Sequence, residues 1–161
     1  MDLKKLANQY KDELLNNVLP FWLEHSQDHE FGGYFTCLDC EGNVFDTDKF
    51  IWLQGREVWL FSMLYNKVEK KQEWLDCAIQ GGEFLKKYGH DGNYHWYFSL
   101  DRAGNPLVEP YNIFSYTFAT MAFGQLSLAT GNQEYADIAK KTFDIILSKA
   151  DNPKGKIGRA H

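Results

Sequence analysis

The sequence predicts an all-α fold in which helix pairs form part of a toroid with two concentric layers. Two observations carry this prediction. Helical segments that are apolar nearly all round alternate along the chain with amphipathic ones, and a short strand-and-turn motif recurs between them. A helix that is apolar on most of its circumference is buried on most sides, whereas an amphipathic helix faces water on one side. These patterns are expected of inner and outer helices respectively.

The chain begins with an amphipathic segment. Apolar residues at helical spacing predict a helix over residues 3–19, and Pro20, which follows, marks its end. Residues 24–33, EHSQDHEFGG, are expected to form a loop. The alternating stretch YFTCLD and the turn residues EGN come next and predict a short hairpin.

Four further helices follow from the apolar periodicity. Their expected bounds are from an N-cap at Thr47 or Asp48 to about Asn66, and then residues 71–88, 112–130 and 132–149. The first and third of these are apolar nearly all round, whereas the second and fourth are amphipathic. Gly131 ends the third of them.

An internal echo supports a repeated unit. Tyr34–Asp39 with the following Gly-Asn resembles Tyr97–Asp101 with its own Gly-Asn, and each echo precedes an apolar helix and then an amphipathic one. We therefore expect about six helices as three pairs with short hairpins between them, in a partial barrel domain over residues 1–150. Residues 151–161 are expected to be a truncated loop or tail, because they begin like the loop into another unit.

Composition narrows the function classes. The 161 residues are 44% hydrophobic and 16% aromatic, with a formal net charge of −5. Such an aromatic share favours a large core or a cleft for sugar rings. No basic patch points to nucleic acid, no apolar run reaches the length of a membrane span, and no signal peptide is evident. Three cysteines form no disulfide framework, so we expect a cytoplasmic protein, and no motif calls for a cofactor.

Arg56 is the main candidate for chemistry, because it lies in an apolar helix. An arginine stays protonated, so a buried one needs a carboxylate or a ligand oxygen as its partner. A structural ion pair with Glu57 or Glu109 is one interpretation. The other is a fixed cation at the mouth of a barrel, placed to stabilise an oxyanion. The spacing alone slightly favours the ion pair.

The longer run around Arg56 identifies a family. GGYF…LD…G…DTDKFIWLQGREVWLFSMLYN resembles the N-terminal signature of the N-acylglucosamine 2-epimerase family, and the resemblance continues through YFSLDRAGNP, EPYNIFSYTFATMAF and NPKGK. It implies an (α/α)6 barrel, of which this chain holds the N-terminal half. It also implies interconversion of N-acyl-D-glucosamine and N-acyl-D-mannosamine by moving the proton on C2 of the open-chain sugar.

In this family an arginine steadies the enolate-like intermediate, and Arg56 matches it by position in the motif. The family's two acid/base histidines lie in the C-terminal half, which is absent here, so we expect the chain to be inactive alone. Trp52, Tyr111, Ser115 and Phe118 are assigned to substrate binding, with ordinary core packing as the alternative for each. Trp52 is one turn before Arg56, and the other three share one face of a helix by spacing.

Several alternatives stay open. A mannose or cellobiose isomerase or epimerase of the same fold is the nearest one, and a non-catalytic protein-binding module is another, since related mammalian epimerases are known as renin-binding proteins. Two copies pairing through bare inner-helix faces predict a homo-oligomer. A glycoside hydrolase would need two opposed carboxylates, and no such pair stands out.

Other reactive residues are assigned no site. His25 and His29 flank an aspartate in a predicted loop, and a metal site would need further ligands. His90 and His95 have no motif partner. The C-x-x-C run at residues 37–40 lacks the strand-to-helix context of a redox site and the extra ligands of a zinc site.

Overall fold

The computed structural model of the chain describes residues 2–110 and 113–150. Its helices are α1 (Leu3–Glu13), α2 (Leu19–His25), α3 (Ile51–Lys67), α4 (Gln72–Tyr88), α5 (Phe114–Thr130) and α6 (Gln133–Ala150), with a π-helical turn η1 (Leu14–Val18) between α1 and α2. Its strands are β1 (Cys37–Leu38), β2 (Val44–Asp46), β3 (Lys49–Phe50), β4 (Ser99–Leu100) and β5 (Pro106–Val108).

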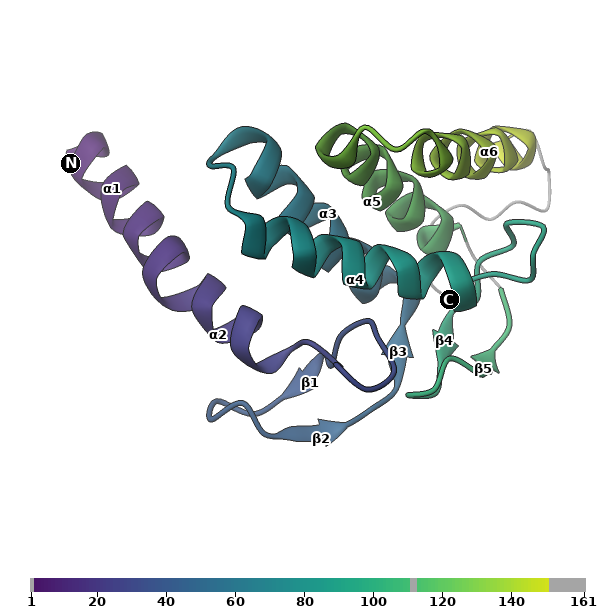
Figure 1. The fold of residues 1–161 in the computed structure, drawn as a ribbon, viewed down its shortest axis with the longest axis horizontal. Coiled ribbons are helices and arrows are strands. Elements are labelled where there is room, and N and C mark those ends of the chain that lie inside the picture. Colours follow the sequence, from purple (N-terminus) through teal and green to yellow (C-terminus); the bar gives the residue numbers. More distant parts are fainter. Residues whose placement is uncertain (1, 111–112, 151–161) are drawn as a thin grey trace.

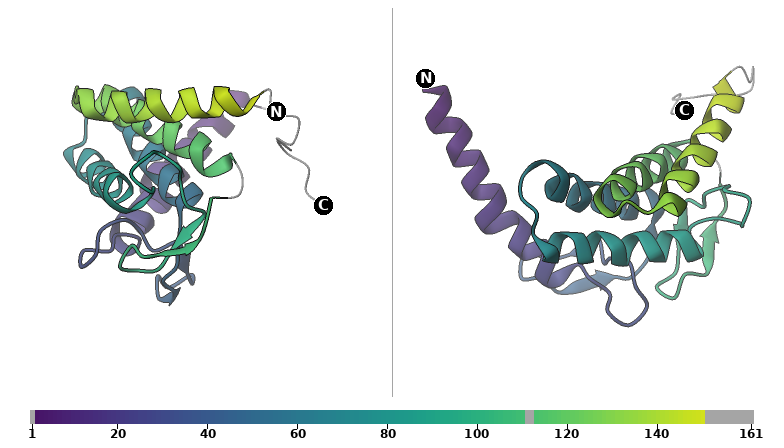
Figure 2. Two further views of the ribbon diagram at one scale, coloured as in Figure 1. Left: turned by 90° about the vertical axis from the view of Figure 1, so that its right-hand side faces the viewer. Right: turned by 45° about the horizontal axis from the view of Figure 1, so that its top comes forward.

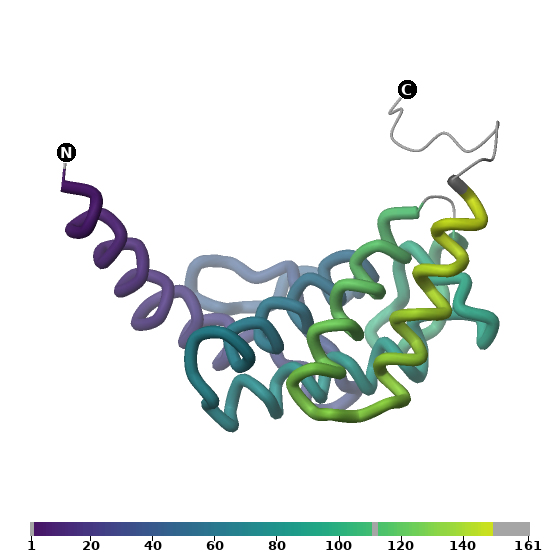
Figure 3. The backbone as a smooth tube through the Cα atoms, turned by 90° about the horizontal axis from the view of Figure 1, so that it is seen from above, coloured from purple at the N-terminus to yellow at the C-terminus, as the bar shows by residue number. Residues whose placement is uncertain are grey.

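The helices form two layers, as the alternation predicts. Helices α3 and α5 lie side by side; α4 packs against both of them and α6 against α5 (Figures 1 and 3). Helix α3 is apolar or buried nearly all round, whereas α4 alternates buried and exposed residues. The all-α fold with an inner and an outer layer is confirmed, and Figure 2 shows that the layers form an open arc.

The first helix runs past its predicted end. Leu3 to His25 form one continuous rod, because the chain widens into η1, where the Leu19 N–H donates to the Leu14 carbonyl. This wider turn comes directly before Pro20, which has no N–H to donate and would otherwise break the helical hydrogen-bond pattern. The predicted end at Pro20 is therefore wrong. In the described part of the chain, α1, η1 and α2 are continuous, so the helices form five rods.

The second predicted helix begins later than expected. Neither Thr47 nor Asp48 caps it, because Lys49 and Phe50 form β3, which pairs with β4. The first backbone N–H of α3, on Ile51, donates to the carbonyl of Phe98 at 3.0 Å. Strand pairing to a distant hairpin thus provides the partner that a side-chain cap would provide in an isolated helix.

The echoed segments form matching hairpins. Strand β1 pairs with β2, and β4 pairs with β5, both antiparallel. In the first turn the Asn43 N–H donates to Asp39 Oδ1 at 2.7 Å, and in the second the Asn105 N–H donates to Asp101 Oδ1 at 2.8 Å. The side-chain amide of each asparagine donates to the other carboxylate oxygen of the same aspartate. The same residues therefore fold in the same way twice.

One core joins both layers. It contains large side chains from helices α2 to α6, from β4 and from the loops that precede β1 and β4: Leu19, Tyr34, Ile51, Phe61, Trp74, Leu85, Trp96, Leu100, Tyr116, Phe123 and Tyr135. Gly131 ends α5 in the left-handed conformation, as predicted. Among the described helices, none combines the length and the apolar character that crossing a bilayer requires.

Candidate functional site

Arg56 is the exception in a buried helix. Among the 17 residues of α3, only Arg56 and the final residue, Lys67, are exposed. The other positions pack against α4, α5 or the loops that precede α3. Arg56 is thus an exposed cation in the second turn of an otherwise largely buried inner helix.

Two aromatic rings flank the Arg56 guanidinium. Its central carbon lies 4.9 Å from the centroid of the Trp52 ring, one turn earlier on α3, and 5.0 Å from the centroid of the Phe118 ring on α5. The two rings lie 6.1 Å apart with a tilt of 53° between their planes. Each cation–π contact at such an exposed place contributes about 0.5–1 kcal/mol. These two contacts restrict the motion of the guanidinium.

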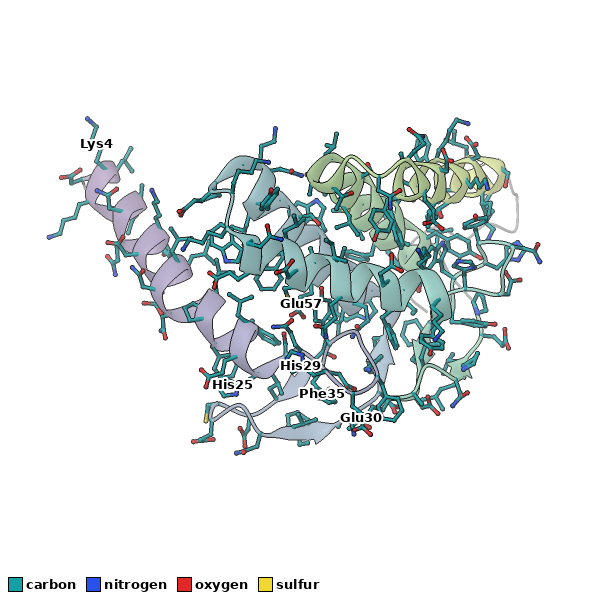
Figure 4. The ribbon with its side chains drawn as sticks, in the orientation of Figure 1. Lys4, His25, His29, Glu30, Phe35 and Glu57 are labelled. Carbon is teal, nitrogen blue, oxygen red and sulfur yellow. The ribbon has the colours of Figure 1, made fainter. Side chains whose placement is uncertain are left out.

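Arg56 has no carboxylate partner in the described part of the chain, where it makes no ion pair and no hydrogen bond. The alternative of an ion pair with Glu57 is therefore wrong. Glu57 points to the other side of α3, where its Oε1 lies 2.5 Å from the hydroxyl of Ser26 at the end of α2. Figure 4 shows Glu57 in the interior, behind α4. The charge of Arg56 thus remains available for a ligand.

Glu57 is itself unusual, because it is only 8% exposed and meets no cation in the part of the chain that the structure describes. Burial raises its pKa to about 8, and the hydrogen bond with Ser26 opposes that rise. The Ser26 hydroxyl lies 2.6 Å from the Trp22 carbonyl as well as 2.5 Å from Glu57. A hydroxyl has one proton, so Ser26 can donate fully to only one of these two oxygens at a time.

A second arginine, Arg102, has the carboxylate partners that Arg56 lacks among the described residues. Arg102 also stacks on two rings, Phe31 at 5.0 Å and Phe35 at 5.2 Å, but its Nε and Nη2 donate to the carboxylate of Asp28. Its Nη2 also lies 2.9 Å from Glu30. The charge of Arg102 is therefore neutralised within the fold, whereas no carboxylate of residues 2–110 or 113–150 pairs with Arg56.

Asp28 and Lys49 form a buried ion pair that the sequence did not reveal as a pair. Lys49 Nζ lies 2.9 Å from Asp28 Oδ2 and also donates to the carbonyls of Gly32 and Arg102. Burial alone would raise the pKa of Asp28, but the hydrogen bonds from Arg102 and Lys49 lower it to about 2. These bonds join the loop after α2, the start of α3 and the second hairpin at one point.

Gln54 holds the same loop from inside α3. Its side-chain oxygen accepts from the Tyr34 N–H and its nitrogen donates to the Tyr34 carbonyl, both at 2.8 Å. Lys49 and Gln54 therefore both hold the loop. The segment 49–56 therefore contains both the residues that hold the loop, Lys49 and Gln54, and the exposed Arg56.

The other predicted substrate residues are placed differently. Trp52 and Phe118 are half-buried and meet at Arg56, so the structure brings these three together. Ser115 is only 2% exposed, and Tyr111 lies outside the described residues. Substrate contacts by these four side chains stay predictions.

The described histidines serve the loops around them. His25 lies at the end of α2 against Phe21, and His29 lies in the loop that follows (Figure 4). In the connection after α4, the His90 ring stacks on Tyr94, and His95 Nδ1 lies 2.9 Å from Asp91. Each of these contacts is local to its loop.

Comparison with known proteins decides the family. The sequence profile described as N-acylglucosamine 2-epimerase matches residues 33–160, which include the whole run around Arg56 and both layers of helices. The chain belongs to the N-acylglucosamine 2-epimerase family.

Curated members of this family resemble the chain over most of its length. N-acylglucosamine 2-epimerase of Homo sapiens is 41% identical over 149 residues, which are 90% of this chain and 35% of that protein. Cellobiose 2-epimerase of Dictyoglomus turgidum is 29% identical over 158 residues, or 96% of this chain and 40% of that protein. The chain thus spans between a third and two fifths of the length of these relatives.

A solved structure of the same family has the same fold. Cellobiose 2-epimerase from Bacillus thermoamylovorans superimposes with a TM-score of 0.84 at 30% identity, covering 94% of this chain and 39% of that one. The two-layered helical arc is therefore the N-terminal part of the epimerase barrel. The expected family and barrel are confirmed.

Proposed function

We propose that the chain provides the arginine half-site of a sugar 2-epimerase that interconverts N-acyl-D-glucosamine and N-acyl-D-mannosamine. The observation that carries this proposal is the exposed Arg56 guanidinium, held between Trp52 and Phe118 and without a carboxylate partner among the described residues. Membership of the epimerase family supports it.

The chemistry of epimerisation explains the need for such a cation. The proton on C2 of an open-chain aldose is weakly acidic, and its removal places negative charge on the aldehyde oxygen. A fixed donor aimed at that oxygen lowers the barrier, and loss of one such donor costs a factor of about 10²–10³ in rate. Arg56 is exposed and has no carboxylate partner among the described residues, so it suits this role in the sugar site.

The reaction also requires a base on one face of C2 and an acid on the other, both titrating near neutral pH. We assign these roles to histidines outside the 161 residues, as the family resemblance implies. Among the described histidines, His25, His90 and His95 contact residues of their own segments, whereas Trp52 and Phe118 both contact Arg56. The chain alone is therefore proposed to be inactive.

The N-acyl sugar is favoured over cellobiose by the degree of resemblance. The human N-acylglucosamine enzyme is 41% identical to the chain, whereas the Dictyoglomus turgidum cellobiose enzyme is 29% identical. A cytoplasmic place in amino-sugar metabolism goes with this choice. A cellobiose or mannose epimerase is the second candidate, and substrate profiling separates the two.

The experiment is a proton-exchange assay on a single-chain chimera. Residues 1–150 replace the matching segment of the human relative, and N-acetyl-D-glucosamine is incubated with the chimera in D2O. Loss of the C2 proton signal by NMR reports the reaction. We expect exchange by the chimera, a drop of about 10²–10³-fold in Arg56→Met, and no change in the matched surface variant Lys140→Met on α6.

Two outcomes would contradict the proposal. Undiminished exchange in Arg56→Met removes the assigned role of the arginine. Exchange by the unmodified 161-residue chain places an acid and a base within it, and His90 and His95 then become the candidates. Cellobiose turned over faster than the N-acyl sugar selects the second candidate function.

We also propose that the chain self-associates through its inner faces. On α5, Phe114, Met121 and Leu128 are exposed at the spacing of one helical face, which also includes Phe118. An apolar face of this kind is seldom left in water. Sedimentation velocity should show a concentration-dependent rise in mass, and a monomer across a hundredfold range of concentration would overturn this proposal.

A further inference from the structure

We propose that Gly55 is a positioning residue for Arg56, because it lets α3 and α5 touch at the level where Phe118 covers the guanidinium. This inference rests on the function proposed for Arg56, and it identifies Gly55 as the residue that allows Phe118 to fix the position of the guanidinium. A glycine inside a helix costs stability relative to alanine, so its place in a buried helix calls for a use. Gly55 is buried in the second turn of α3.

The close approach at Gly55 involves backbone atoms. A Cβ atom on Gly55 would lie 3.0 Å from the carbonyl carbon and 3.0 Å from the carbonyl oxygen of Phe118, and 3.1 Å from its Cβ. These atoms belong to the backbone and root of α5 and cannot rotate away as the end of a long side chain can. A side chain at position 55 therefore requires α5 to give way by a few tenths of an ångström at Phe118.

The residue that would be displaced is the one that stacks on Arg56. The Phe118 ring on α5 lies 5.0 Å from the guanidinium. The Trp52 ring, which makes the second contact with the guanidinium, belongs to α3 together with Gly55. A shift of α5 would carry the Phe118 ring away while Trp52 stays with Arg56. The contact between the Phe118 ring and the guanidinium would then loosen, and the guanidinium would gain freedom.

A second helical glycine provides a matched control. Gly124 lies in α5, two turns after Phe118, and a Cβ there would have no atom within 4 Å. Alanine at this position changes the helix in the same chemical way without forcing α3 and α5 apart.

Chemical labelling of Arg56 tests the proposal without any sugar. Phenylglyoxal modifies arginine, and peptide mass spectrometry of the full chain gives the labelling rates of Arg56 and Arg102 separately. Arg102 is the internal reference, because Asp28 and Glu30 hold its guanidinium. This ratio reports the local state of Arg56, and a general loss of stability moves both rates together.

We expect the Arg56 to Arg102 labelling ratio to rise about twofold in Gly55→Ala and to stay unchanged in Gly124→Ala. Removing the ring outright in Phe118→Val should raise the ratio about two- to fivefold, the equivalent of the ~0.5–1 kcal/mol of one cation–π contact. A folded Gly55→Ala protein with the wild-type ratio overturns the proposal.

If Gly55→Ala does not fold, the labelling ratio of Phe118→Val tests the proposal instead. An unchanged ratio in that variant shows that α5 does not hold Arg56, which overturns the proposal, whereas a raised ratio supports it. A failure of the sugar assay with a raised labelling ratio would reject the proposed function and leave the positioning role in place.

Discussion

Replacing Glu57 with glutamine isolates the pH dependence that a buried carboxyl group gives this fold. Glu57 has no cationic partner among the described residues, and burial raises its pKa from an ordinary 4.5 to about 8. The neighbouring Tyr34 and Cys77 stay uncharged, because burial raises the pKa of both above their usual values. Glutamine has nearly the same shape and can still donate to Ser26, but it does not titrate.

The sign and size follow from proton binding. Below pH 4.5 both the folded and the unfolded chain hold the proton, and the stabilising effect of the neutral form is fully present. Between pH 4.5 and 8 the unfolded chain loses the proton while the folded chain keeps it, so stability falls as pH rises, by up to about 1.4 kcal/mol per pH unit. By pH 7 the wild type should have lost about 3 kcal/mol relative to Glu57→Gln.

The assay is urea unfolding of both proteins at pH 5, 6 and 7, followed by tryptophan fluorescence and circular dichroism. Histidines titrate in both proteins, so their effects cancel in the difference between the two free energies of unfolding. We expect this difference to grow with pH in favour of Glu57→Gln. Two free-energy curves that run parallel from pH 5 to 7 would refute the reasoning, because Glu57 would then be ionised in the folded chain.

Three further predictions concern stability. Lys49→Met should cost about 3–5 kcal/mol in urea unfolding, because it leaves the carboxylate of Asp28 buried without its lysine; a cost below 1 kcal/mol would show that Arg102 alone suffices. Gly124→Ala should stabilise the chain by up to about 1 kcal/mol, whereas Gly55→Ala should destabilise it, and equal shifts of melting temperature would contradict the close helix contact. Arg56→Met should change the free energy of unfolding by no more than about 1–2 kcal/mol, since only two exposed ring contacts are lost; a larger loss would make Arg56 structural.

The helical core of the fold was predictable from local patterns. The bounds of α4, α5 and α6 lie within two residues of those expected, because their apolar periodicity and the glycine after α5 are local signals. The predicted helix bounds are wrong where contacts with other segments, rather than local sequence, determine where a helix begins or ends. The rod continues through Pro20 because a π-helical turn precedes it, and α3 begins at Ile51 because β3 pairs with β4, nearly 50 residues away along the chain.

The candidate site was predictable in part. The run around Arg56 gave its identity, and the spacing placed Trp52 on the same face. The contact with Phe118 and the absence of a carboxylate partner among the described residues required the packing of α5 on α3. The Asp28–Lys49 pair was missed, since its members lie 21 residues apart in a loop and a strand and no local rule joins them.

The sequence by itself determined the family, the alternation of inner and outer helices, and Arg56 as the residue to examine. Each of these depends on residue identities and on periods of a few residues. The tertiary structure decided which charges are free. Arg56 and Arg102 both stack on aromatic rings, but only Arg102 meets Asp28, and Glu57 turns away into an apolar interior that keeps it neutral. Charge partnership depends on distance and burial in space, and neither follows from the position of a residue along the chain.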